Sequence, residues 1–382
     1  MSLAAGLAGH GGRLCVARAL YPRAPEPWID LSTGINPEAY PAPYASAAAR
    51  GRLPTPEEIR ALEVTAGRAF GVDSADRIAA AAGSEAALRL MPYALEGRAP
   101  AESRPMPYAL RGRAAAESRP MSYAWPAEEA VVVGPTYSSH AATWQQAGAH
   151  VHFANGIASD MSDSLDVAVR FAESMPPRSA ITLVNPNNPD GALISREHLL
   201  RLHDVIASRD DHLVVDEAFA DAEPVCSVAA FAGTARYPQL IVLRSFGKFY
   251  GLAGVRLGFV IGASPVIARF RELLGDWPVS ADAIAAGLAA YADDPWATHT
   301  RERLLHAARR LDDVLIRSGF AIVGGTSLFR LARHEDARNR FENLLRAGVL
   351  ARPFDHDPTL LRFGLPHEPS AWQRLADALR TP

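Results

Sequence analysis

The protein has 382 residues, of which 48% are hydrophobic, and a formal net charge of −3 at pH 7. A chain of this length and apolar content buries a large core, and we expect one large domain with a smaller one. The small net charge gives no electrostatic reason for nucleic acid or an acidic membrane as a partner.

No stretch approaches the ~18 to 20 apolar residues of a membrane span, and the N-terminus lacks a basic segment followed by an apolar one. We therefore expect a cytoplasmic protein. Two cysteines are too few for a disulfide framework or a cysteine metal cluster, and no metal site is expected.

The first segment places glycines next to His10 and Arg13. Backbone amides in such a segment can shape an anion site, and the alternative interpretation is a flexible polar N-terminus. A second segment, Trp28 to Pro37, ends in Gly-Ile-Asn-Pro and contains Asn36.

Residues 55–70 show helical spacing of apolar side chains after a Thr-Pro-Glu-Glu start. The next segment predicts a strand that ends at Gly83 and a helix that begins near Ser84. Free N–H groups at a helix start attract phosphate, and the Ser84 hydroxyl can add to them.

Residues 91–105 are repeated almost unchanged as residues 106–120. Two copies of 15 residues, rich in proline, arginine and alanine, do not form a solenoid. We interpret this segment as a tandem duplication in a surface loop and assign it no chemistry.

Three apolar runs follow, and each predicts a buried strand that ends in a polar or aromatic residue. They end before Tyr137, before the turn that contains Asn188, and at Asp216. An aspartate at the end of a buried strand is costly unless it is paired.

A fourth buried run, Leu240 to Leu243, leads into Ser-Phe-Gly-Lys and Lys248, the only lysine of the chain. A lysine amine can lose its proton and form a Schiff base with a carbonyl, which arginine cannot do. Ser245 and Arg256 on either side of Lys248 are suited to hold a phosphate.

The rest of the chain predicts a last strand at 257–261, helical periodicity from about 281 to 316, and then an α+β lobe. Short strands are expected at 321–323, 326–331 and 360–365, with a helix around 341–345. Arg362 lies in the last of these strands.

These motifs resemble the fold-type I, or aspartate aminotransferase-like, family of enzymes that depend on pyridoxal 5′-phosphate (PLP). The family's anchoring block is S-x-x-K with an arginine eight residues after the lysine, and its N-P-x-N-P-x-G block matches residues 185–191. The resemblance implies an α/β fold with a mainly parallel sheet at 45–265, interrupted by the insertion at 91–120. It also implies a smaller α+β domain from 1–44 plus 266–382, and a homodimer.

The resemblance also implies a role for each motif residue. Lys248 would hold PLP, Asp216 would pair with its pyridine nitrogen, Tyr137 would stack on the ring, and Asn188 would donate to the ring oxygen. Gly83, Ser84, Ser245 and Arg256 would hold the cofactor phosphate, and Arg362 would grip the substrate α-carboxylate.

The N-terminal HGG and STGINP segments resemble the opening of threonine-phosphate decarboxylases of the cobalamin pathway. This implies decarboxylation of L-threonine O-3-phosphate to (R)-1-aminopropan-2-yl phosphate and CO₂. Asn36 would then contact the substrate carboxylate, and the candidates for contact with the substrate phosphate are His10, Arg13 and a further arginine whose position is not assigned. The alternatives are an aminotransferase, such as histidinol-phosphate aminotransferase, which shares every cofactor residue, and a non-catalytic PLP-binding regulatory module.

Overall fold

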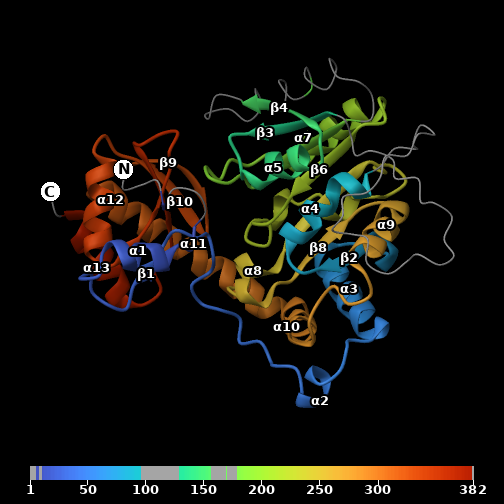
Figure 1. Ribbon diagram of the computed structural model, residues 1–382, viewed down its shortest axis with the longest axis horizontal. Coiled ribbons are helices and arrows are strands. Elements are labelled where there is room, and N and C mark those ends of the chain that lie inside the picture. The colour runs from blue at the N-terminus through green and yellow to red at the C-terminus, as the bar shows by residue number, and fades with distance from the viewer. Residues whose placement is uncertain (1–5, 8–10, 96–128, 156–168, 170–178, 381–382) are drawn as a thin grey trace.

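The computed structural model describes residues 6–7, 11–95, 129–155, 169 and 179–380 (Figure 1). Within this part, the chain forms a large unit built on a seven-stranded sheet and a small unit built on a four-stranded sheet. The second half of the tandem repeat and most of its first half lie outside the described residues.

The large sheet has the strand order β2-β8-β7-β6-β5-β3-β4. All neighbouring pairs are parallel except those that β8 makes with β2 and β7. Its strands are β2 (Ile78–Ala81), β3 (Glu129–Gly134), β4 (His150–Asn155), β5 (Ala180–Val184), β6 (His212–Asp216), β7 (Leu240–Ser245) and β8 (Gly258–Ile261). A mainly parallel sheet is the predicted fold class, which is confirmed.

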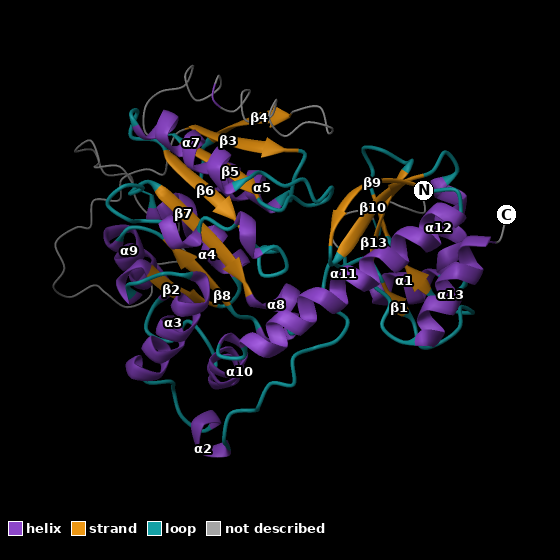
Figure 2. Ribbon diagram, turned by 180° about the vertical axis from the view of Figure 1, so that it is seen from behind, coloured by secondary structure: helices purple, strands orange, loops and turns teal. Residues whose placement is uncertain are grey.

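The central strands β5 and β7 are buried along their whole length because helices cover both faces of the sheet (Figure 2). This explains why the Val, Ile and Leu residues of these strands do not alternate with exposed polar residues, since both faces of the sheet are buried. The helices of the large unit are α2 (Ala47–Arg50), α3 (Pro56–Phe70), α4 (Ser84–Ala94), α5 (Ser139–Gln146), α7 (Arg196–Ala207), α8 (Phe246–Phe249), α9 (Ser264–Leu274) and α10 (Ala281–Tyr291). Short 3₁₀ turns occur at Ala75–Arg77, Pro224–Cys226, Ala229–Phe231 and Ala253–Val255.

Helix α3 begins where the sequence predicts it. The Thr55 hydroxyl accepts from the Glu58 N–H, and the Glu58 carboxylate accepts from the Thr55 N–H in return. This reciprocal capping satisfies two backbone donors at the helix start.

The small unit is built from both an N-terminal and a C-terminal segment of the chain. Strand β1 (Ile29–Asp30) pairs in parallel with β11 (Val349–Leu350), so the N-terminal segment lies among the C-terminal elements (Figure 1). Its antiparallel sheet has the order β12-β13-β10-β9. The remaining elements are α1 (Leu14–Leu20), β9 (Ala321–Thr326), β10 (Phe329–Arg333), α12 (Ala337–Arg346), β12 (Arg352–Pro353), β13 (Leu360–Gly364) and α13 (Pro369–Arg380).

The helical stretch expected at about 281–316 is two helices, α10 and α11 (Asp294–Arg317). The break occurs because the Asp293 side chain caps α11 by accepting from the Trp296 N–H, and Pro295 lies in the first turn. Helix α9 packs against α4 and β2, and α10 packs against α3, so both belong with the large sheet. We therefore propose a domain boundary within α11 in place of the one expected at residue 265.

No helix of the described residues is both long enough and apolar enough to cross a membrane.

Candidate active site

A cavity of about 440 Å³ lies where the carboxyl ends of β5, β6 and β7 face the small unit. Ligand sites of open α/β sheets gather at this edge. Its charged lining consists of Glu85, Arg89, Asp216, Lys248, Arg256, Arg352 and Arg362. Five cations against two carboxylates predict a ligand that carries several negative charges.

Lys248 lies on α8, directly after β7, and its side chain lines the cavity. Burial and, to a smaller extent, the charge of Arg362 together lower the pKa of the amine to about 8, against the opposing effect of the Asp216 carboxylate. Near pH 8 about half of the Lys248 amines are therefore unprotonated. A neutral amine is the form that can attack a carbonyl.

Four residues form one end of the cavity, which we call the phosphate cup: Gly83, Ser84, Ser245 and Arg256. Ser84 begins α4, so the free N–H groups of an 11-residue helix point into the cup. The Arg256 guanidinium lies so close over Gly83 that a Cβ there would be 2.6 Å from Nη2, and the φ of Gly83 is +91°. Only glycine fits this position without strain.

Asp216 ends β6 and is 5% exposed. Its Oδ2 lies 3.1 Å from Nε2 of His140 on α5, and its Oδ1 accepts from the Ala218 N–H at 2.9 Å. His140 is fully buried, and its Nδ1 has no hydrogen-bond partner among the described residues. The two contacts hold the Asp216 carboxylate at the cavity wall. The sequence analysis missed His140, which lies 76 residues before Asp216 and carries no motif.

Asn188 and Arg362 meet at another part of the cavity wall. Arg362 Nη1 donates to Asn188 Oδ1 at 2.5 Å, and Arg362 Nη2 donates to the Ser32 carbonyl at 2.7 Å. Because the Asn188 oxygen accepts, its amide nitrogen is left as the donor. Burial and the nearby charge of Arg352 lower the pKa of Arg362 to about 9.

Arg352 is a second arginine of this wall that the sequence analysis did not select. It pairs with Arg362 across the antiparallel strands β12 and β13, and both side chains line the cavity. Burial lowers the pKa of Arg352 as well. Two cations at paired positions oppose each other, and an anion between them would relieve this repulsion.

Comparison with known proteins identifies the family. Residues 113–379 match the family model "Aminotransferase class I and II". The threonine-phosphate decarboxylase of Pseudomonas aeruginosa is 36% identical over 371 residues, which cover 97% of this chain and 96% of that protein. The chain belongs to the aminotransferase class I and II family.

A histidinol-phosphate aminotransferase matches about half of the chain, and a solved structure matches it in fold. Histidinol-phosphate aminotransferase 1 of Bradyrhizobium diazoefficiens is 34% identical over 198 residues, which cover 50% of this chain and 55% of that protein. The crystal structure of a histidinol-phosphate aminotransferase from Clostridium acetobutylicum superposes with a TM-score of 0.73 at 18% identity. It covers 92% of this chain and 98% of that one. This second likeness confirms the fold.

PLP is the cofactor of the aminotransferase class I and II family, and the cavity fits it. The absence of a side chain at Gly83 lets the Arg256 guanidinium lie over the start of α4, and Gly258 lets β8 approach, since a Cβ there would lie 2.4 Å from the Ser84 nitrogen. Lys248 faces the same cavity, with Nζ 5.9 Å from the centre of the Phe219 ring. The predicted cofactor residues Gly83, Ser84, Tyr137, Asn188, Asp216, Ser245, Lys248 and Arg256 all line this one cavity.

Two of the three predicted N-terminal substrate contacts, Asn36 and Arg13, lie outside the lining of this cavity. Asn36 is buried outside the cavity lining, where its Nδ2 donates to the Phe249 carbonyl and its Oδ1 accepts from Arg303. Arg13 also lies outside the lining, and its Nη1 donates to the Gly6 carbonyl at 2.8 Å. His10 lies outside the described residues.

Gly11 and the neighbouring 32–34 segment take the place expected for Asn36 and Arg13 at the cavity. The reason lies in the backbone: the Gly12 N–H donates to the Ser32 hydroxyl at 2.7 Å, and the Asn36 N–H donates to the Lys248 carbonyl at 2.9 Å. Ser32 lines the cavity, whereas the Asn36 side chain bonds to the Phe249 carbonyl and to Arg303.

Proposed function

We propose that the chain is a PLP-dependent decarboxylase that converts L-threonine O-3-phosphate to (R)-1-aminopropan-2-yl phosphate and CO₂, a step of cobalamin biosynthesis. The observation that carries this proposal is the 36% identity to a threonine-phosphate decarboxylase over 97% of the chain. The aminotransferase relative covers only 50% of it.

The charges of the cavity support a substrate with two anionic groups. Arg256 in the phosphate cup is assigned to the cofactor phosphate, and Arg89 pairs with Glu85 at 2.8 Å, which leaves Arg352 and Arg362. We assign Arg362 to the substrate carboxylate and Arg352 to the substrate phosphate. The planar, forked guanidinium suits both groups, because it makes two parallel hydrogen bonds to either of them.

The reaction breaks the Cα–carboxylate bond, releases CO₂ and adds a proton to Cα. When bound, PLP takes up the electron pair that this bond leaves behind. Asp216, which is held by His140 and the Ala218 N–H, would pair with the protonated pyridine nitrogen. A fixed anion at that position favours the electron-accepting state.

Lys248 is our candidate for the proton donor to Cα. With a pKa lowered to about 8, its amine can both release and return a proton close to neutral pH. Two arginines that hold the substrate at both ends would keep Cα within reach of this single amine.

The test is a product assay with the purified protein, PLP and L-threonine O-3-phosphate, with and without 2-oxoglutarate. We expect CO₂ and an aminopropanol phosphate without any oxo acid. Glutamate formation that depends on 2-oxoglutarate when histidinol phosphate is offered, with no CO₂ from L-threonine O-3-phosphate, would assign the protein to the aminotransferases.

A homodimer and a cytoplasmic location, both expected from the sequence, stay predictions. Size-exclusion chromatography with light scattering of the holoenzyme tests the first, and cell fractionation tests the second.

A further inference from the structure

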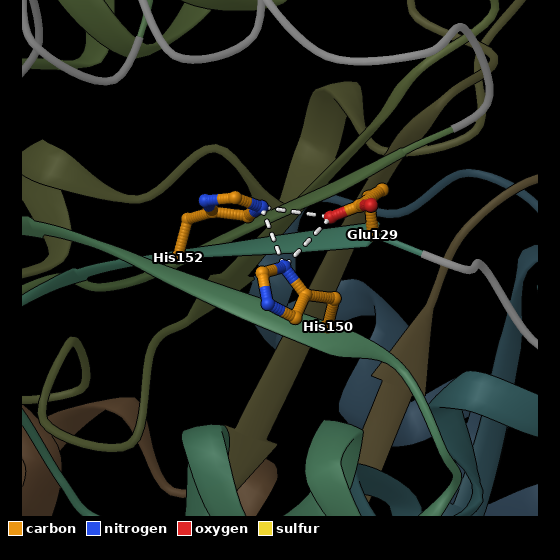
Figure 3. A group of neighbouring side chains, drawn as sticks. All are labelled: Glu129, His150 and His152. Carbon is orange, nitrogen blue, oxygen red and sulfur yellow. Dashed lines mark hydrogen bonds and ion pairs between the residues drawn. The ribbon is translucent and has the colours of Figure 1, made fainter.

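Two histidines and a glutamate converge at the outer edge of the large sheet, on β3 and β4 (Figure 3). The His152 Nε2 lies 2.7 Å from Glu129 Oε2, and the His150 Nδ1 lies 3.4 Å from the same oxygen. The two ring nitrogens are 3.1 Å apart. Three donor atoms of three side chains therefore surround one point.

The strand register creates this arrangement. His150 and His152 are two residues apart on β4, so both point to the same face of the sheet. Glu129 on the parallel strand β3 pairs with His150 in register, and Val131 pairs with His152. The Glu129 carboxylate thus lies beside both imidazoles, and the backbone of two paired strands holds all three side chains in place.

The chemistry of the three donors matches a borderline divalent cation. Zn²⁺ binds imidazole nitrogen and carboxylate oxygen at about 2.0–2.2 Å, which separates the ligand atoms of a tetrahedral site by about 3.3 Å. The observed separations of 2.7, 3.1 and 3.4 Å need only small side-chain shifts to reach that value. Without a cation, two ring nitrogens face each other at hydrogen-bond distance, and one of them must carry a proton there.

We propose that Glu129, His150 and His152 form a binding site for Zn²⁺ or a cation of similar chemistry. Imidazole selects Zn²⁺, Ni²⁺ or Cu²⁺ over Mg²⁺ and Ca²⁺, which prefer sites made of oxygen atoms alone. The described residues supply three ligands, and the fourth tetrahedral position is then open to water.

The site lies at the opposite end of the sheet from the cavity. Glu129 and His150 are the first residues of β3 and β4, whereas Tyr137, which lines the cavity, follows the carboxyl end of β3. Bound Zn²⁺ would cross-link β4, the edge strand, to β3 and stabilise the sheet edge. We therefore expect it to change stability and to leave the chemistry at Lys248 unchanged.

The experiment uses the tag-free holoenzyme after dialysis against a chelator. Isothermal titration with Zn²⁺ is expected to give one site per chain with a dissociation constant on the order of micromolar or tighter. Mg²⁺ at the same concentration is expected to give no heat of binding. Zn²⁺ should also raise the Tm by at least about 2 °C, because it binds the folded state alone.

His150→Gln, His152→Gln and Glu129→Gln should each weaken Zn²⁺ binding at least about tenfold and remove the rise in Tm. His367→Gln is the matched control, since His367 is also an exposed histidine paired with a glutamate, Glu368 at 3.3 Å. It should bind Zn²⁺ like the wild type.

Two results would overturn the proposal. One is a wild-type protein that takes up no Zn²⁺ at micromolar concentrations, which would reduce the cluster to an ordinary ion pair. The other is equal Zn²⁺ affinity in the wild type and in all three variants, which would place the bound ion elsewhere.

Discussion

Arg362 and Asn188 are joined by a 2.5 Å hydrogen bond from Nη1 to Oδ1, although 174 residues separate them in the chain. The bond runs from β13 of the small unit to the turn after β5 of the large sheet. Arg362 also donates to the Ser32 carbonyl, so its guanidinium is held from two sides. A guanidinium that is already held in position loses less conformational entropy when a substrate carboxylate binds.

The assignment of the two arginines to two substrate groups is testable with the reaction product, which keeps the phosphate but lacks the carboxylate. Arg352→Met should raise the inhibition constant of (R)-1-aminopropan-2-yl phosphate by about 10- to 100-fold, because a charged hydrogen-bond donor to phosphate is lost. Arg362→Met should leave that constant nearly unchanged and raise the KM for L-threonine O-3-phosphate by a similar factor. Equal effects of both variants on the product would contradict the assignment.

Gly83→Ala should weaken PLP binding at least about tenfold. The new Cβ would lie 2.6 Å from Nη2 of Arg256, and a φ of +91° strains any side chain. Equilibrium titration of the apoenzyme with PLP, followed by absorbance, measures the effect. Gly254→Ala is the matched control because a Cβ there meets nothing within 4 Å. Similar PLP affinity for both variants would show that the phosphate cup tolerates a methyl group.

Lys248→Ala should lower kcat by several orders of magnitude and abolish covalent retention of PLP, because the chain has no other lysine. Borohydride reduction of the holoenzyme followed by peptide mass spectrometry is the measurement. The wild type should carry the label on Lys248, and the variant should carry none. A label on another side chain of the variant would refute the central role of Lys248.

The stability of the apoenzyme should rise with pH because of Lys248. Burial lowers the pKa of the folded state to about 8, compared with the ordinary value of 10.5. Between these two values the unfolded chain holds a proton that the folded chain has released, so the free energy of unfolding increases with pH. Below pH 8 the folded state carries the whole cost of burying the charge, which is roughly 3 kcal/mol.

Lys248→Met isolates this effect, since it removes the buried charge and keeps the apolar stem. The apo variant should be more stable than the apo wild type at pH 7, and its advantage should shrink as the pH approaches 10. Urea unfolding at both pH values provides the comparison. An advantage that does not change with pH would mean that the lysine is not buried as a charge.

Arg244→Met should destabilise the fold by about 3–5 kcal/mol, because it leaves two buried carboxylates without their cation. Arg244 is 3% exposed and forms ion pairs with Glu217, at 2.8 Å, and with Asp221. Urea unfolding measures the loss. Arg333→Met, which breaks an exposed pair with Asp357, should cost less than about 1 kcal/mol. A similar cost for both variants would contradict the prediction.

The sequence alone predicted the large sheet and the residues that follow its strands. Short runs rich in Val, Ile and Leu marked β5, β6 and β7, and parallel strands bring their carboxyl ends to one edge. For that reason Asn188, Asp216 and Lys248 could be placed together without coordinates. Each prediction depended on a side chain close in sequence to the strand that positions it.

The tertiary structure decided what depends on pairing between distant segments. Asn36 lies outside the cavity lining because its side chain bonds to the Phe249 carbonyl and to Arg303, whereas Arg352 reaches the cavity because β12 pairs with β13. The cluster of Glu129 with His150 and His152 likewise exists only through the register of β3 on β4. Local spacing specifies where a strand ends, but cross-strand register is set by packing of the whole chain, and no short motif encodes it.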